Sequence, residues 1–296
     1  MQGEELRKSA VLMRIQVIEP HGFCAGVTNA LRKAQSLFGA ANQVKQSNNQ
    51  TIKQCYCLHE LVHNELVVND LKRRGMVFVE SLDEVPEGAT VLFSAHGVSP
   101  AVRAQAASRK LKVVDATCPF VEKVHKAAKE FASRGLKVVV IGNPDHAEVK
   151  GITGEVLDSV VYNPSTRNFS TSQLTLGVVS QTTMNADEVA DIVGKLRSGY
   201  EVETMAEVCN ATKVRQDAVK AFDGDALLVL GSVNSSNTRR LCEVAKCAKV
   251  FRAGTLDEVK AIDFSGVSVL GVTSGASTPE NFFTDVIEYL QHQQGE

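Results

Sequence analysis

Three cysteines divide this chain into segments of nearly equal length, and the residues around them repeat. Cys24, Cys118 and Cys209 are separated by 94 and 91 residues. Each follows a short run rich in β-branched residues and opens a segment in which apolar residues recur every three or four positions. That pattern is typical of a strand followed by an amphipathic helix. The repeat therefore indicates three similar α/β units of about 90 residues each.

Glycine and proline residues mark the expected ends of the helices. Three glycines follow the cysteine-led segments at positions suited to helix C-caps: Gly39, Gly135 and Gly224. Pro119 stands where the first helical residue is expected. Ser99-Pro100 and Thr278-Pro279 are expected to supply the N-cap and first residue of two later helices.

Further strands match between the units. Lys137–Gly142 corresponds to Ala226–Gly231, and both are continuous apolar runs typical of buried parallel strands. Strands that alternate with helices predict parallel sheets with right-handed crossovers. The third unit has no strand after its last helix, and the strand before Cys24 could fill that position. The chain would then close into a ring with pseudo-threefold symmetry.

The fold expected from these patterns is an α/β chain of three pseudo-threefold-related parallel-sheet units around a common centre. The expected units are residues 26–118, 119–205 and 206–296, the last completed by a strand and cysteine loop in 1–25. Ligands of parallel α/β sheets bind at the carboxyl ends of the strands. The three cysteines follow such ends, and so do polar residues in all three units: His63, His96, His146, Glu148, Ser235, Ser236, Asn237 and Ser277.

The seven cysteines favour metal binding or catalysis over a disulfide framework, because their number is odd and the sequence shows no secretory signal. Thiolates from distant positions suit an iron–sulfur cluster, in which three ligands would leave one iron open to substrate. A zinc ion with His146 as fourth ligand and buried thiols without a metal are the alternatives. Four cysteines fall outside the repeat and are interpreted as structural: Cys55, Cys57, Cys242 and Cys247.

The polar residues at the helix starts suit an anion, because backbone N–H groups bind phosphate there. Walker motifs are absent and Lys and Arg are scarce in these turns, so the donors would be neutral side chains and backbone. Each Ser or Asn alone is an ordinary N-cap, and each His an ordinary turn residue. Glu148 alone could be an acid that complements the helix dipole. Their recurrence in three units favours a functional interpretation.

Seven short motifs occur in order along the chain: Gly22–Gly26, Leu61–Asn64, Phe93–Ser99, Asp115–Pro119, Ser180–Thr183, Asn234–Asn237 and Gly275–Ser277. From about Ile15 to the C-terminus, the chain resembles the 4-hydroxy-3-methylbut-2-enyl diphosphate reductase family. The resemblance implies a three-unit α/β fold around a [4Fe-4S] cluster. It also implies the last step of the non-mevalonate isoprenoid pathway, in which two electrons convert an allylic alcohol diphosphate to isopentenyl and dimethylallyl diphosphates and water.

The resemblance also implies residue roles. Cys24, Cys118 and Cys209 would hold the cluster, and the substrate hydroxyl would bind its free iron. Glu148 would supply the proton, with Thr182 beside the substrate hydroxyl. The substrate would be bound by Thr182 and by seven residues of the polar turns: His63, His96, His146, Ser235, Ser236, Asn237 and Ser277. The electron donor would be a ferredoxin or flavodoxin.

The chain departs from the family pattern in three places. Ala147 stands between His146 and Glu148, where the family usually has proline. The residues after Cys209 differ from the family's usual sequence, which affects the expected packing there. The polar segment 41–53 is longer than usual and is interpreted as a surface loop.

Composition excludes several other classes of protein. Apolar residues make up 44% of the chain and the net charge is −2, which is typical of a globular protein without a field that would attract nucleic acid or an anionic membrane. Apolar runs are strand-sized, and the first ten residues carry acids rather than a long apolar core. These features favour the cytoplasm. A non-redox hydro-lyase and an iron–sulfur sensor or electron carrier are the rival functions.

Overall fold

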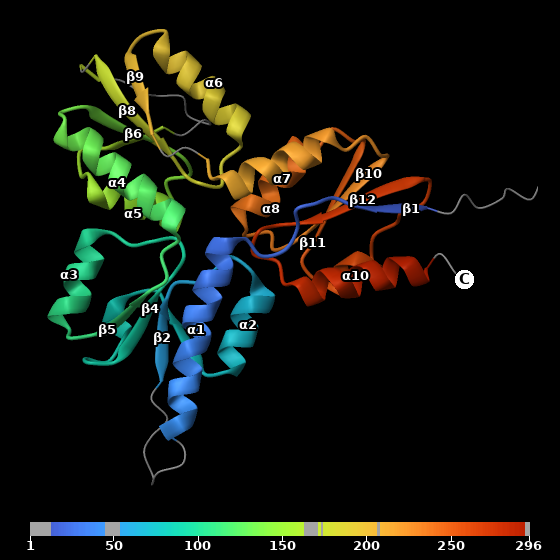
Figure 1. The fold of residues 1–296 in the computed structure, drawn as a ribbon, viewed down its shortest axis with the longest axis horizontal. Helices are drawn as coiled ribbons and strands as arrows, with labels where there is room; N and C mark the ends of the chain where they lie inside the picture. The colour runs from blue at the N-terminus through green and yellow to red at the C-terminus, as the bar shows by residue number, and fades with distance from the viewer. Residues whose placement is uncertain (1–12, 45–53, 163–170, 173, 206–207, 294–296) are drawn as a thin grey trace, which may run out of the picture.

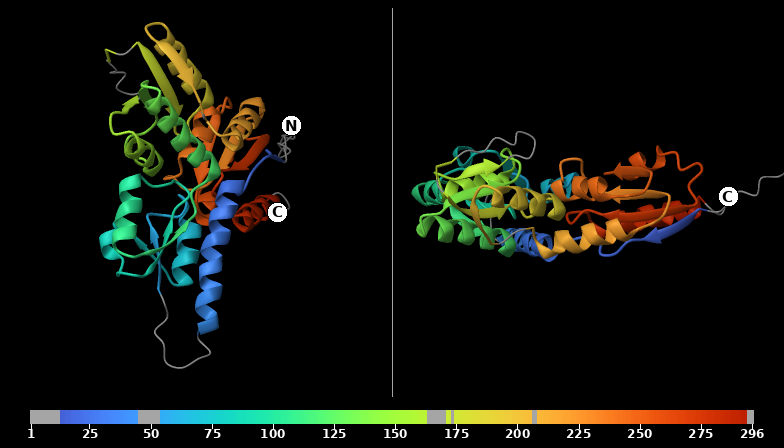
Figure 2. Two further views of the ribbon diagram at one scale, coloured as in Figure 1. Left: turned by 60° about the vertical axis from the view of Figure 1, so that its left-hand side comes forward. Right: turned by 90° about the horizontal axis from the view of Figure 1, so that it is seen from above.

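The computed structural model describes residues 13–44, 54–162, 171–172, 174–205 and 208–293, with only the backbone described for 39–44. The first ten residues and most of the polar segment 41–53 therefore lie outside the described residues. Three α/β units lie side by side around a common junction (Figure 1), and the view from above shows that together they form a flat layer (Figure 2).

The first unit is a parallel sheet with strand order β3-β2-β4-β5. Its strands are β2 (Cys55–Leu58), β3 (Met76–Val79), β4 (Thr90–Phe93) and β5 (Lys112–Asp115). Buried apolar residues of helices α1 (Ala25–Val44) and α2 (Glu65–Arg73) cover one face of the sheet. The other face is covered by α3 (Pro100–Ser108) and the short helix η1 (Leu82–Glu84).

The second unit repeats this arrangement with strand order β7-β6-β8-β9. Its strands are β6 (Lys137–Ile141), β7 (Val160–Tyr162), β8 (Thr175–Ser180) and β9 (Glu201–Thr204). Helices α4 (Pro119–Ser133) and α5 (Ala147–Glu155) cover one face, and α6 (Ala186–Arg197) covers the other. Apolar residues recur in α4 every three or four positions, as expected of a helix with one buried face. The four residues at this spacing are all buried: Val121, Val124, Ala128 and Phe131.

The third unit has strand order β11-β10-β12-β1. Its strands are β10 (Ala226–Leu230), β11 (Lys249–Ala253), β12 (Val269–Ser274) and β1 (Arg14–Val17). Helices α7 (Asn210–Ala221) and α8 (Ser236–Val244) cover one face, and α9 (Leu256–Lys260) and α10 (Glu280–His292) cover the other. All five side chains of β10 are fully buried, because helices pack on both faces of the sheet.

Strand β1 gives the third sheet its edge. It pairs in parallel with β12, from Arg14 opposite Val269 to Val17 opposite Val272. It thus occupies the position of β5 and β9 in the other sheets, and each of these three strands leads to one cysteine of the repeat. The α/β fold of three parallel sheets is as expected. We keep the unit boundaries after residues 118 and 205 as a proposal.

Three expectations about helix ends were wrong. Gly39 lies inside α1, which continues to Val44, because the following alanines favour helix. Gly224 lies beyond the C-cap of α7 and does not adopt a positive φ, whereas Gly135 does with a φ of 78°. Pro279 is the N-cap of α10 rather than its first residue.

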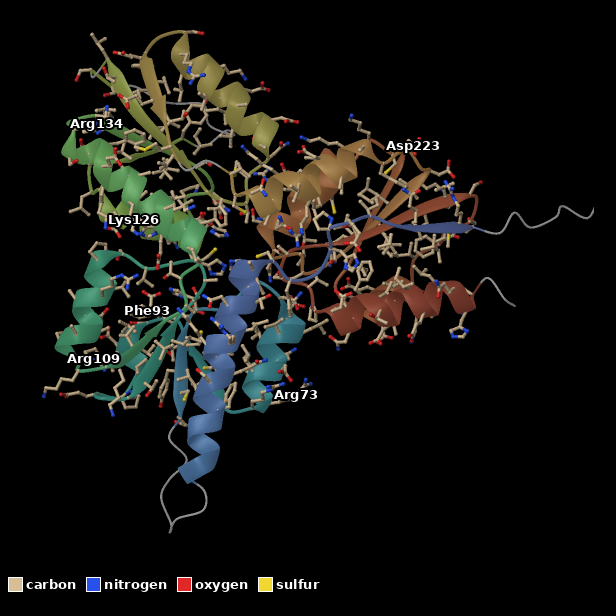
Figure 3. All side chains as sticks on the ribbon, in the orientation of Figure 1. Arg73, Phe93, Arg109, Lys126, Arg134 and Asp223 are labelled. Atoms are coloured by element: carbon tan, nitrogen blue, oxygen red, sulfur yellow. The ribbon has the colours of Figure 1, made fainter. Side chains whose placement is uncertain are left out.

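The helices of the cysteine repeat point their N-terminal ends at the junction (Figure 1). The labelled side chains Arg73, Arg134 and Asp223, which lie at or just beyond the C-terminal ends of α2, α4 and α7, are at the periphery (Figure 3). No helix in the described part of the chain is long and apolar enough to span a membrane.

Candidate active site

The carboxyl ends of the three sheets border a central cavity of about 110 Å³. All twelve residues singled out from the sequence line it: Cys24, His63, His96, Cys118, His146, Glu148, Thr182, Cys209, Ser235, Ser236, Asn237 and Ser277. Each unit contributes to the lining, so the cavity depends on the arrangement of all three sheets.

The three cysteines occupy equivalent positions. Cys118 and Cys209 are the N-caps of α4 and α7, and Cys24 immediately precedes α1. Each backbone N–H is anchored to the polar turn of a neighbouring strand by one hydrogen bond: Cys24 to the carbonyl of Ala276 at 3.1 Å, Cys118 to Ala95 at 3.0 Å and Cys209 to Thr182 at 3.1 Å. These bonds fix the direction in which each helix leaves the junction.

The local environment of the sulfurs combines burial with N–H donors. Burial raises the pKa of Cys118 and Cys209, while hydrogen bonds from the first turn of each helix oppose the shift. The hydroxyl of Thr212 lies 3.2 Å from the sulfur of Cys209. Negative charge on Cys24 raises the pKa of both further. A positively charged metal centre between them would reverse this repulsion and favour the thiolates.

The space around the sulfurs is kept open by a glycine. A Cβ atom at Gly26 would lie 2.6 Å from the sulfur of Cys118 and 3.8 Å from that of Cys24. Among the described residues, no three His, Cys, Asp or Glu side chains have the arrangement of a single-ion site. The cysteines instead border the cavity as three free thiols. This donor set at helix N-termini fits an iron–sulfur cluster.

Three histidines form a group at one side of the cavity. The rings of His63 and His96 are stacked with centroids 4.3 Å apart, and His146 meets both edge-on at 5.3 and 5.5 Å. Burial lowers the pKa of His96 well below its usual value, and its histidine neighbours add to the shift. Burial, His63 and Arg239 lower the pKa of His146 to about 3. His96 and His146 are therefore neutral at pH 7.

Glu148 lies in the first turn of α5 and is 2% exposed. The backbone N–H of Thr182 donates to its Oε1 at 2.7 Å, and the Thr182 hydroxyl lies 3.1 Å from its Oε2. Burial raises the pKa of Glu148 to about 7, although both contacts with Thr182 oppose the shift. A carboxyl group with this pKa holds a transferable proton near neutral pH.

The third unit contributes hydroxyl and amide groups. Ser235 caps α8 through the N–H of Thr238, and Ser236 accepts a hydrogen bond from Gln181 at 3.3 Å. Asn237 accepts the N–H of Ala276 at 2.9 Å. Ser277 donates to the carbonyl of His63 at 3.2 Å, which joins the third unit to the first.

A second, wider cavity of about 520 Å³ adjoins the central one. Its lining shares His63 and His146 with the central cavity and includes the cations Lys150 and Arg239. The polar turns themselves carry few Lys and Arg residues, as the sequence indicated. Lys150 and Arg239 nevertheless reach the wider cavity from positions one helical turn into α5 and α8.

Sequence reasoning missed two residues that hold the site together. Gln181 of the second unit donates to Ser236 of the third at 3.3 Å, and the amide of Asn237 reaches the hydroxyl of Thr212 within the third unit at 3.5 Å. Gln181 and Thr212 belong to sequence segments that had been noted, but nothing in their spacing indicated these contacts.

The model of the LytB protein family matches residues 15–291. The chain belongs to the LytB family. The resemblance stated from the sequence motifs is confirmed, because LytB relatives carry the reductase name. The 4-hydroxy-3-methylbut-2-enyl diphosphate reductase of Acidithiobacillus ferrooxidans is 40% identical over 299 residues, covering 94% of this chain and 89% of the relative. The enzyme of the same name from Anaplasma marginale (strain Florida) is 38% identical over 302 residues, covering 97% and 86%.

The fold also matches a solved LytB-type structure. The E-1-hydroxy-2-methyl-but-2-enyl-4-diphosphate reductase of Plasmodium falciparum superposes with a TM-score of 0.82 at 30% identity. The match covers 94% of this chain and 87% of that one. The three-unit architecture is therefore the architecture of a known reductase.

Proposed function

We propose that this chain reduces 4-hydroxy-3-methylbut-2-enyl diphosphate to isopentenyl and dimethylallyl diphosphates, with uptake of two electrons and two protons and release of water. The observation that carries the proposal is the placement of the Glu148–Thr182 pair and three histidines in one cavity with three free thiols. The pair can hold a proton, the histidines can bind a diphosphate, and the thiols can hold a redox cofactor. The names of the LytB relatives support the same reaction.

Cys24, Cys118 and Cys209 would hold one [4Fe-4S] cluster. When bound, the cluster would supply electrons and a Lewis-acidic iron at the substrate's C–O bond. The protein would stabilise the thiolates through the N–H groups at the starts of α4 and α7. Gly26 would leave the space that the sulfurs and the cluster need.

The histidines and the α8 turn would bind the diphosphate. The Nδ1 atoms of His63, His96 and His146 contact Glu60, Ser94 and the N–H of Glu148, so the Nε2 atoms would be the ones that bind the diphosphate. Neutral His96 and His146 avoid mutual charge repulsion. Hydroxyl and amide donors would come from the third unit, namely Ser235, Ser236, Asn237 and Ser277. Contacts to the diphosphate, which does not react, would position the reacting carbon.

Glu148 would hold the proton that the allylic carbon receives. With a pKa of about 7, its carboxyl is partly protonated at neutral pH. Its Oε1 is occupied by the Thr182 N–H, so the proton would reside on Oε2, beside the Thr182 hydroxyl. That hydroxyl would lie next to the substrate and could pass the proton on.

The rival functions fit the site less well. A carrier of electrons would not need a carboxyl group with a raised pKa beside three histidines. A hydro-lyase could use the same groups, but it would not take up electrons during turnover. We further propose a ferredoxin- or flavodoxin-type electron donor and a cytoplasmic location.

The test is anaerobic purification with iron and sulfide analysis, followed by an assay with the allylic diphosphate and a chemical reductant. We expect about four irons per chain and formation of both products only when reductant is present. Consumption of the substrate without electron uptake, with formation of a product that is not reduced, would support the hydro-lyase. Absence of iron and sulfide from active protein would contradict the cluster.

A further inference from the structure

Arg215 is a buried cation that bridges two of the cysteine-bearing segments. It lies on α7 and is 5% exposed. Its Nη1 donates to the carbonyl of Ala211 at 2.9 Å and its Nη2 to the carbonyl of Gly22 at 3.0 Å. Gly22 belongs to the loop that carries Cys24, whereas α7 begins directly after Cys209. The guanidinium therefore joins the two loops at the place where the ring of three units closes.

The positive charge of Arg215 has no carboxylate partner within ion-pair distance in the described part of the chain. Its Nε is buried without a hydrogen-bond partner. The nearby groups of opposite charge are Cys24, Cys209 and Glu19. The Glu19 side chain is 70% exposed and contacts His21, so Cys24 and Cys209, when ionised, would be the less exposed negative groups near the guanidinium.

A buried guanidinium requires compensation. Burial lowers the pKa of Arg215, while negative charge on Cys24 and Cys209 opposes the shift. Arginine nevertheless stays protonated in proteins. A buried charge without a partner is strongly destabilising. Among the Lys and Arg residues that the structure describes, Arg215 alone is buried. It is held there by two carbonyl groups from the segments that carry Cys24 and Cys209.

We propose that Arg215 is the counter-charge of the iron–sulfur cluster and raises its reduction potential, an inference that rests on the proposed function. Three thiolates give a [4Fe-4S] cluster a net negative charge, and one-electron reduction adds another. A fixed positive charge nearby favours the more negative state, and net charge and hydrogen bonding around the sulfurs set the potential of such clusters. Arg215 is thus a positioning and tuning residue rather than a catalytic one.

Two substitutions separate its charge from its hydrogen bonds. Arg215→Gln removes the charge, whereas Arg215→Lys keeps the charge and loses the planar fork that reaches both carbonyls. Lys220→Gln is the matched control, because it removes one charge from the same helix at a residue paired with Asp187, away from the cysteines. Iron content and the cluster's reduction potential would be measured anaerobically on all four proteins, the potential by a redox titration followed by electron paramagnetic resonance.

We expect Arg215→Gln to disfavour the reduced cluster at least tenfold at a fixed potential, which corresponds to a shift of ~59 mV to more negative values for one electron. Arg215→Lys and Lys220→Gln should stay close to wild type. Loss of iron in the Gln variant alone, with the Lys variant intact, would also support a charge role.

A wild-type potential in an iron-replete Gln variant would overturn the inference. Loss of iron from both Arg215 variants would also overturn it, because cluster binding would then depend on the hydrogen bonds between the two loops and not on the charge. Wild-type protein that binds no cluster would instead refute the proposed function.

Discussion

Both carboxyl oxygens of Glu148 are held by one residue, Thr182. The backbone N–H of Thr182 donates to Oε1 at 2.7 Å, and its hydroxyl lies 3.1 Å from Oε2. Glu148 belongs to α5, whereas Thr182 follows β8 and also accepts the N–H of Cys209. One threonine therefore connects the carboxyl group that would hold the proton to a loop that would hold the cluster.

The first prediction is that Glu148→Gln lowers turnover by at least ~10²-fold, because the amide cannot donate an acidic proton. A purely structural acid in the first helical turn would contribute only ~0.3–1 kcal/mol through the helix dipole. Cluster content, substrate affinity and reductant-driven turnover would be measured on one preparation. Glu148→Asp, which keeps the acid but shortens it, should retain part of the rate. Turnover of the Gln variant within a few-fold of wild type would mean that another group delivers the proton.

The raised pKa of Glu148 predicts a pH-dependent effect on stability. The unfolded chain loses this proton near pH 4.5 and the folded chain near 7, so the folded state binds more protons in between. The contribution is fully present below pH 4.5 and is lost as pH rises through 7. Above pH 7 the folded chain instead carries the cost of a buried, charged carboxylate, which Glu148→Gln removes. The variant should therefore gain up to roughly 3 kcal/mol over wild type above pH 7 and nothing near pH 4.5. Urea unfolding at matched iron content would measure this, and a pH-independent difference would contradict it.

The histidine group predicts tighter substrate binding at lower pH. His96 and His146 are neutral at pH 7 because burial lowers their pKa, and a bound diphosphate would stabilise their protonated forms. Affinity should therefore rise as the pH falls from about 8.5 to 5.5. His96→Asn and His146→Asn should flatten this profile. The phosphate groups of the substrate titrate in the same way with wild type and with the variants. The difference between their pH profiles therefore reports the contribution of the histidines alone. Parallel profiles would leave hydrogen bonding as the only contribution of these side chains.

The fold could be predicted from the sequence because the same local pattern of apolar residues occurs three times along the chain. Strand, cysteine and helix recur about every 90 residues, and parallel sheets place all strand ends on one edge. The convergence of Cys24, Cys118 and Cys209 followed from that rule. Gly39 was misjudged because a glycine ends a helix only where the following residues cannot continue it.

Contacts between residues far apart in the sequence could not be predicted in the same way. Arg215 lies among the residues after Cys209 that depart from the family pattern, and its bond to Gly22 spans 193 positions. Thr212 reaches Asn237 only because α7 and α8 pack together. Such pairs depend on how helices pack and how sheets are rotated about the common axis, and residue spacing carries no information about either.

The remaining cysteines are predicted to be dispensable for the cluster. Burial raises the pKa of Cys57 to about 12 and that of Cys242 to about 11, so neither readily forms the thiolate that a metal requires. A variant with Cys55→Ala, Cys57→Ala, Cys242→Ala and Cys247→Ser should keep its iron and visible absorption. Alanine is preferred in β2 because a serine hydroxyl would be buried there. Single alanine changes at Cys24, Cys118 or Cys209 are the comparison, and each should lose cluster or activity.

Gly26 gives a prediction in which stability and cofactor binding move in opposite directions. A Cβ at this position would lie 2.6 Å from the sulfur of Cys118, so the sulfur would have to move from the position in which it borders the cavity. Alanine also favours a helix over glycine by ~1 kcal/mol, and residue 26 lies in α1. Gly26→Ala should therefore lower iron content several-fold while the cluster-free protein unfolds at the same or a higher temperature.

Gly194→Ala is the matched control, because Gly194 lies in α6 and a Cβ there would meet nothing within 4 Å. It should stabilise the protein by a similar amount and leave the iron content unchanged. Iron analysis and thermal unfolding of both variants would be compared with wild type. Full iron occupancy in Gly26→Ala would show that the sulfurs have another way to reach the cluster, and the space kept by this glycine would then have no role in binding it.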